Sequence, residues 1–203
     1  MSIRKSEAPA RRRRRSPEDA REEILASARS LLLSQGPEAV TLKAVAGELG
    51  MSHANLLHHF GSAAGLQSEL ARFMADRVNA KIAAAVEKAR AGEADARDIA
   101  DMTFDAFGKG GAGALAAWMI LSGNRDALAG ILGSIRNLVA QLSVGHEDRH
   151  VPDTTLWLVL LALGDALLGE PIADALELPH DTAREIAAKR LRAQIERSIH
   201  DQP

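Results

Sequence analysis

The chain has 203 residues, of which 46% are hydrophobic, and a formal net charge of −2 at pH 7. This composition excludes a disordered protein, and the lack of cysteine excludes disulfides and thiolate metal sites. Because no uninterrupted apolar run reaches the roughly 18 residues of a membrane span and the basic N-terminus lacks a secretory apolar stretch, we expect a cytoplasmic protein with no membrane partner.

Charge is divided unevenly along the chain. Residues 1–15 carry seven basic residues against one acid, and five of the seven are consecutive: Arg11, Arg12, Arg13, Arg14 and Arg15. Residues 16–66 carry three basic and six acidic residues. Because neutralisation of phosphates by Lys and Arg supplies much of the affinity for DNA, we interpret residues 1–15 as a basic arm that contacts DNA. A solvated tail is the alternative.

Residues 16–66 are predicted to form three helices. The first begins at Ser16, an N-cap followed by proline and acids, and ends at Gly36. Thr41 caps a second helix, which Gly50 closes, and Ser52 restarts the chain as a third helix. A polar leading turn then precedes apolar residues one turn apart, which is the helix-turn-helix pattern, whose second helix enters the major groove.

The rest of the chain is predicted to be all-α as well. Residues 67–203 would form one helical body that binds a ligand and dimerises. Residues 16–66 are called the head below. The helix that connects the head to the body is predicted to span residues 62–92, and the further helices of the body residues 96–107, 114–123, 126–142, 153–169 and 181–199.

Two motifs suggest other chemistry, but their contexts do not support it. Residues 108–113 match the dinucleotide pattern G-x-G-x-x-G without the strand that the motif requires, so a turn is expected. His146, Glu147 and His150 match H-E-x-x-H, which on a helix would hold zinc for a hydrolase. Glycine before and proline after this segment favour an exposed loop, and we expect no metal, no cofactor and no enzyme activity.

Two elements of the C-terminal third are predicted to form a dimer seam. Residues 156–163 are apolar on nearly every side, so this helix must be covered on all sides. One side can face the chain's own core and the other a second subunit, together with the last helix; a monomer with a tightly filled core is the alternative. The candidate contacts are Leu156, Trp157, Leu160, Leu163, Leu191 and Ile195.

Apolar and aromatic side chains gather on the central helices and are the candidate lining of a small-molecule site. Since the whole chain has four Phe and two Trp, aliphatic side chains should form most of the wall. A small apolar effector is therefore expected. The candidates are Met102, Phe104, Phe107, Trp118 and Met119.

The run from Thr41 through Ala46 and Gly50 to Ser52, and then Leu56, His58, His59 and Phe60, resembles the TetR family of ligand-responsive bacterial transcription regulators. The resemblance covers about residues 16–70. It implies a homodimeric regulator, commonly a repressor, that an effector releases from its DNA operator. The departures from the family pattern that bear on phosphate contact are Leu57, where a phosphate-contacting Tyr is usual, and Ala63 and Ala64, where a Lys-Glu pair is common. Leu32 and Pro37 also replace two usual aromatics.

Within this resemblance, residue roles follow from side-chain chemistry. His53, Asn55 and His58 are candidates for base edges, since Asn suits adenine N6 and N7, and Ala54 lies in the same leading turn. The candidates for phosphates are Thr41, Lys43, Ser52, His59 and the basic arm. Two rival functions stay open: a helical ligand-binding dimer with impaired DNA binding, and a zinc hydrolase built on the H-E-x-x-H segment.

Overall fold

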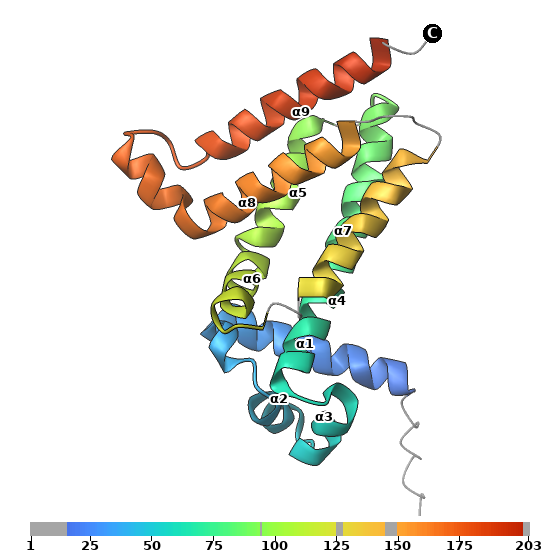
Figure 1. Cartoon of the computed structure of the whole chain (residues 1–203), viewed down its shortest axis with the longest axis vertical. Coiled ribbons are helices and arrows are strands. Elements are labelled where there is room, and N and C mark those ends of the chain that lie inside the picture. The colour runs from blue at the N-terminus through green and yellow to red at the C-terminus, as the bar shows by residue number, and fades with distance from the viewer. Residues whose placement is uncertain (1–15, 94, 125–127, 145–149, 201–203) are drawn as a thin grey trace, which may run out of the picture.

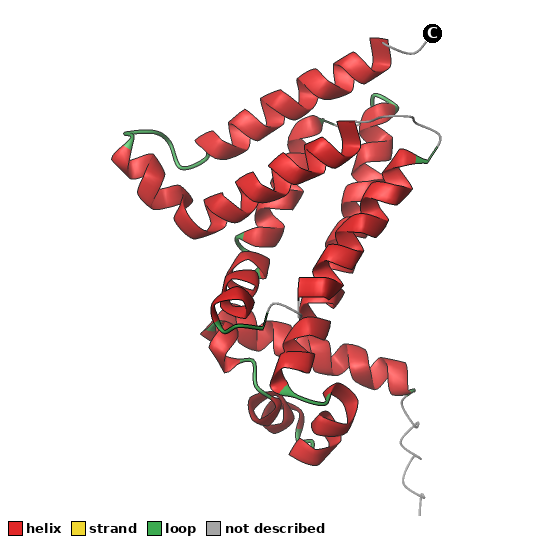
Figure 2. Cartoon of the chain, viewed as in Figure 1, coloured by secondary structure: helices red, strands yellow, loops and turns green. Residues whose placement is uncertain are grey.

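The computed structural model describes residues 16–93, 95–124, 128–144 and 150–200 (Figure 1). All regular structure in these residues is helical, as predicted, and they contain no strand (Figure 2). The elements are α1 Pro17–Gln35, the 3-10 helix η1 Pro37–Ala39, α2 Leu42–Leu49, α3 His53–Phe60, α4 Ala63–Arg90, α5 Ala96–Phe107, α6 Ala112–Leu121, α7 Leu128–Ser143, α8 His150–Ala175 and α9 Thr182–His200.

The predicted starts of the first four α-helices are confirmed. A hydroxyl caps each one and accepts a hydrogen bond from a backbone N–H in the first turn, which satisfies one of the donors that a helix start leaves open. The donor-to-oxygen distances lie between 3.0 and 3.2 Å. The four capping residues are Ser16, Thr41, Ser52 and Ser62.

One apolar core holds the head and continues into the body. It is built from α1, α2 and α3 and includes Ile24, Val45 and Leu56, all fully buried. Leu70 of α4 and Leu115 of α6 belong to the same cluster. The head therefore has no core separate from the long helix that carries it, and the boundary that we place between residues 66 and 67 falls inside α4.

The body is a layered arrangement of helices. In Figure 1, α4 and α7 run side by side, and α8 and α9 both pack against α5. A second core joins α5, α8 and α9 around Phe104, Ala162 and Ala187, and a third joins α4, α7 and the start of α8 around Leu138.

The predicted end of α8 at residue 169 was wrong. The helix continues through Pro171 to Ala175. A proline inside a helix leaves one carbonyl without its intrahelical donor and usually bends the helix. That carbonyl belongs to Leu167, a residue that is 45% exposed. Figure 1 shows that α8 changes direction along its length. The connection to α9 is consequently shorter than predicted.

By length and composition one helix of the described chain, α8, could cross a membrane, with mean hydropathy 1.7. A single such helix is weak evidence, since a core helix of a soluble protein meets the same criteria. Asp153, Asp165 and Glu170 interrupt its apolar run, as the sequence indicates. Only 17% of the most apolar window is buried inside this chain, so the helix carries much apolar surface that nothing in one copy covers.

Candidate functional site

The turn between α2 and α3 fixes the angle between these two helices of the head. Gly50 adopts a left-handed conformation, with φ 62° and ψ 29°, which a residue without a Cβ adopts at little cost. The N–H of Met51 donates to the carbonyl of Ala46 at 2.9 Å and closes the turn. Leu56 and Phe60 then anchor α3 in the core, with exposed fractions of 0% and 8%.

The leading side of α3 faces solvent. His53, Ala54, Asn55 and His58 are all exposed, and His59 is half-buried, with its ring centroid 6.2 Å from that of Phe60. The base-edge candidates therefore lie on an accessible surface and not against their own subunit. Their contact with DNA stays a prediction.

The phosphate candidates flank this surface. Lys43 and Ser52 are exposed and Thr41 is half-buried. The Thr41 and Ser52 hydroxyls each accept a hydrogen bond from their own helix, at 3.1 and 3.2 Å, which leaves their O–H groups able to donate to a phosphate oxygen. Arg11–Arg15 lie outside the described residues.

Arg21 contributes to the joint between head and body. Its Nη2 lies 2.7 Å from Oε2 of Glu69 on α4, and its guanidinium carbon lies 4.9 Å from the centre of the Phe60 ring. Burial alone would raise the pKa of Glu69, but the hydrogen bonds and charges of Arg21 and Arg72 outweigh it and hold that pKa below its ordinary value. Arg21 thus joins α1, α3 and α4, a role that the sequence analysis missed.

Two further joint residues carry little sequence signal. The side chain of Gln67 is buried on α4, and its Nε2 donates to the carbonyl of Val40 at 3.2 Å. A Cβ on Gly65 would overlap the carbonyl oxygen of Phe60, so the end of α3 can approach the start of α4 only because residue 65 has no side chain. The sequence signal that could have identified this role of Gly65 is its position in the first turn after the N-cap Ser62.

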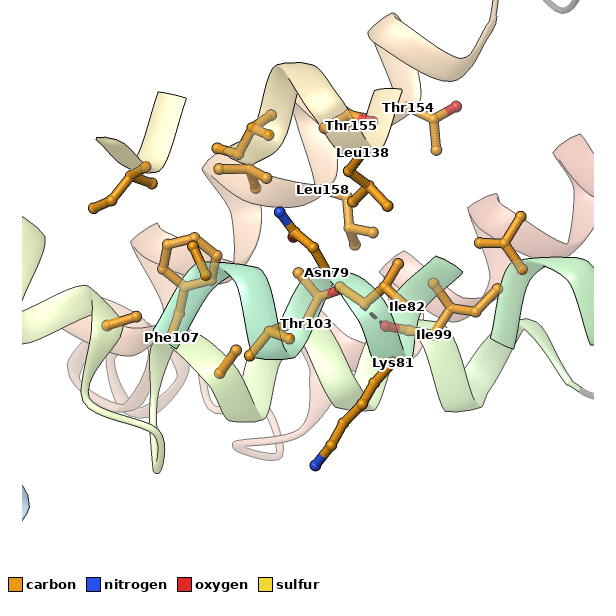
Figure 3. Close-up of a pocket in the computed structure, with 18 of the residues that line it drawn as sticks. Asn79, Lys81, Ile82, Ile99, Thr103, Phe107, Leu138, Thr154, Thr155 and Leu158 are labelled. Atoms are coloured by element: carbon orange, nitrogen blue, oxygen red, sulfur yellow. Dashed lines mark hydrogen bonds between the residues drawn. The ribbon is translucent and has the colours of Figure 1, made fainter. Parts of the chain in front are cut away.

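The body contains a cavity of about 1790 Å³, partly open to solvent, between α4 and the helices that surround it (Figure 3). The predicted apolar stripe of α4 contributes Phe73, Val78, Ile82 and Val86 to its wall. Most of the remaining wall is aliphatic, as the composition indicates.

Of the five predicted ligand contacts, Phe107 lines this cavity. Phe104 and Met119 are buried, with exposed fractions of 1% and 0%. Phe104 belongs to the second core, and Met119 belongs to the core that the head shares with α4 and α6. Met102 and Trp118 are half-buried, and neither is among the described residues that line the cavity. Ligand contact by any of the five stays a prediction.

The predicted dimer contacts fall into two groups. Leu156 and Leu160 expose 62% and 58% of their surface on α8. Trp157, Leu163 and Ile195 are half-buried, and Leu191 is already buried within one chain, at 6%. Further exposed apolar residues extend this face along α8 and onto α9: Leu167, Leu168, Ile172, Leu176 and Ile186.

The predicted zinc segment is described only in part. His146 and Glu147 lie outside the described residues, while His150 is exposed at the first turn of α8. Within the described ranges, no group of three His, Cys, Asp or Glu side chains could hold a metal ion. In the same ranges the G-x-G-x-x-G segment connects α5 and α6, both helices.

A helix-turn-helix head with an exposed polar α3, joined through one core to a helical body with a large cavity, defines the class of helix-turn-helix regulators. Residues 24–70 match the model of the bacterial regulatory proteins of the tetR family. This match places a tetR-family DNA-binding domain over the head, as the resemblance implied, and it supports a transcriptional regulator.

One similar solved structure is described as a transcriptional regulator from Saccharomonospora viridis in complex with choline. The two chains are 17% identical, the match covers 91% of this chain and 97% of the other, and the TM-score is 0.53. At this identity the likeness shows that the two proteins share a fold. No curated protein matches the chain.

Proposed function

We propose that this regulator is a homodimeric repressor that a small apolar molecule releases from its operator. The observation that carries the proposal is the exposed leading turn of α3, in which His53, Asn55 and His58 are accessible while Leu56 and Phe60 hold the helix from behind. A rigidly held helix with polar side chains at its start suits base-edge contacts in the major groove.

A twofold pair of heads would contact two half-sites about 34–36 Å apart. The uncovered apolar face of α8 and α9 supports this pairing, because such a patch on a soluble chain usually marks an interface. Two α8–α9 pairs would meet as a four-helix seam centred on Leu156 and Leu160. A second copy covers this face better than a bilayer does, because Asp165 and Glu170 lie on the same helix.

The cavity supports the ligand part of the proposal. Its wall runs along α4, the helix that carries the head, so a ligand that prefers one tilt of α4 would change the spacing of the two heads. Such a ligand shifts the equilibrium by its differential affinity, typically about 1–3 kcal/mol. The choline complex of the similar structure supports small-molecule binding by a protein of this fold.

An electrophoretic mobility shift with the DNA that flanks the protein's own gene tests the function. We expect a sequence-specific complex whose mobility fits two copies of the chain. Asn137→Ala, a change at an exposed asparagine of α7, is the control and should leave the complex intact.

The departures at Leu57, Ala63 and Ala64 favour one other function, a ligand-binding dimer that has lost DNA binding. That protein would leave all flanking fragments unshifted at low salt while remaining a folded dimer.

A further inference from the structure

We propose that the effector is an uncharged, elongated aliphatic molecule with a carbonyl or ester oxygen, which accepts a hydrogen bond from Asn79 and reaches the hydroxyl of Thr154. This inference rests on the proposed function, because it assigns a chemical class to the ligand of that regulator. It is carried by the shape of the cavity, by the placement of charge around it, and by two polar atoms that lack partners.

The cavity is long. Its wall along α4 runs from Ala71 to Arg90, which corresponds to roughly 28 Å at about 1.5 Å per helical residue. Aliphatic residues from α5, α7 and α8, such as Ile99, Leu138 and Leu158, line the same space (Figure 3). A space of this length and lining fits a chain-like apolar ligand better than a compact polar one.

Charge is kept to the edge of the cavity. In the described lining every charged side chain except that of Arg90 is exposed. The exposed charged residues are Arg29, Arg77, Lys81, Glu87, Asp153 and Arg190. The side chain of Lys81 points away from the other residues drawn in Figure 3.

Arg90 is half-buried, but its charge is already matched. Its Nη1 lies 3.2 Å from Oε1 of Glu87, and its Nη2 donates to the carbonyl of Leu142 at 3.0 Å. An ionised ligand group inside the cavity would therefore lose its hydration without gaining an opposite charge, which is costly. This argument disfavours both carboxylates and ammonium ions inside the cavity.

Two polar side chains in the lining differ from their neighbours. The hydroxyls of Thr103 and Thr155 donate to carbonyls of their own helices, Ile99 and Val151, at 2.9 and 2.8 Å. In contrast, Nδ2 of Asn79 and Oγ1 of Thr154 have no hydrogen-bond partner among the described residues, although both atoms are buried.

Buried polar atoms in native proteins are nearly always paired, so an unpaired one calls for an explanation. Figure 3 shows Asn79 extending from α4 toward the space below α8. A ligand oxygen at this point would accept from the amide, and the Thr154 hydroxyl can donate to or accept from a second polar atom. The rest of the ligand would bury apolar surface along α4.

Calorimetry with three molecules of similar length tests the class, using the full chain: 2-undecanone below its solubility limit, and decanoate and decyltrimethylammonium below their micelle concentrations. We expect the ketone to bind most tightly. Tighter binding of either ion by tenfold would overturn the inference. So would the absence of binding by all three to a protein whose circular dichroism shows it to be folded.

Matched variants test the two polar atoms. Asn79→Leu should weaken ketone binding by about 2- to 10-fold, the loss of one neutral hydrogen bond. Thr154→Val should leave ketone binding within a factor of two, because the ketone lacks the second polar atom that this hydroxyl would meet. Thr155→Val and Thr103→Val are the controls, since these hydroxyls are bonded to their own helices, and ketone affinity should stay within a factor of two. No effect of Asn79→Leu, or an equal effect of a control, would contradict the assignment.

The mobility shift without ligand is an independent readout. A protein that binds the ketone but shifts no flanking DNA would retain this inference and refute the proposed repressor. A protein that shifts DNA but prefers an ion would do the reverse.

Discussion

Replacing Leu160 by alanine should weaken the proposed dimer without unfolding the subunit. Leu160 exposes 58% of its surface in one chain, so little of its side chain supports the monomer core. Fully burying a leucine contributes about 1.5–3 kcal/mol relative to an exposed one. The exposed 58% therefore corresponds to about 1–2 kcal/mol per copy, and two copies meet at a twofold seam.

A destabilisation of about 2–4 kcal/mol per dimer corresponds to a dissociation constant roughly 30- to 700-fold higher, since each 1.4 kcal/mol is tenfold. Sedimentation equilibrium over a dilution series measures this directly. Leu121→Ala is the control, because Leu121 is 85% exposed on α6, outside the α8–α9 face. Equal dimer affinities for the two variants, or a wild-type chain that stays monomeric throughout, would refute the proposed seam.

Four other changes probe the head, the arm and the body. Asn55→Ala should relax discrimination at one or two operator positions at a cost of about 1–3 kcal/mol, measured by competition between operator variants; uniform weakening would indicate a phosphate contact instead. Deleting residues 1–15 should reduce the slope of log K against log salt by about 0.9 for each phosphate that the arm neutralises in the full chain, and an unchanged slope in a salt titration would contradict the arm. Burial alone would raise the pKa of Asp105, but the hydrogen bond and charge of Arg184, 2.8 Å away, lower it below the ordinary value. A depressed carboxyl stabilises the fold above its unfolded pKa, about 3.9, and this contribution is lost as pH falls through the folded pKa. The Asp105→Asn variant should thus have a lower free energy of unfolding than wild type at pH 7, and the difference should shrink in acid. A difference that does not change with pH in urea titrations would exclude the charge pair as its cause. Asn79→Leu should leave the ligand-free protein as stable as wild type or up to about 3 kcal/mol more stable, because it removes an unpaired buried amide; a lower melting temperature would mean that Asn79 supports the fold.

The head could be predicted almost residue by residue because its signals are local. Each cap acts within three residues, as the bond from the Asn55 N–H to Ser52 shows, and Gly50 closes α2 through its own φ. Such short-range features depend little on what packs against them. The long α4 and the range of α5 were predictable for the same reason, since hydrophobic spacing and breaks at glycine are readable without tertiary contacts.

The body was less predictable because its features depend on packing between distant segments. Pro171 looked like a helix end, but α8 continues because its exposed backbone can tolerate a missing donor. Phe104 and Phe107 lie on one helix, yet Phe104 packs into the second core beneath Arg184, 5.4 Å from its ring, while Phe107 lines the cavity. The packing of α8 and α9 decides which face of α5 lines the cavity, and no local sequence pattern encodes that packing.

The core that the head shares with α4 and α6 explains how ligand binding in the cavity could affect α3. Ala71, Met74 and Leu115 line the cavity and also belong to the core that holds the head. A close-packed interior transmits a displacement instead of absorbing it, and Arg21 and Gln67 tie α1 and the turn before α2 to the same helix. A ligand that contacts Leu115 and the stripe of α4 would therefore act on the head through shared side chains, with no loop in between to dissipate the movement. The coupling can be no larger than the ligand's preference between two positions of α4, so a molecule that only fills the cavity, without favouring either position, would bind tightly and leave the affinity for DNA unchanged.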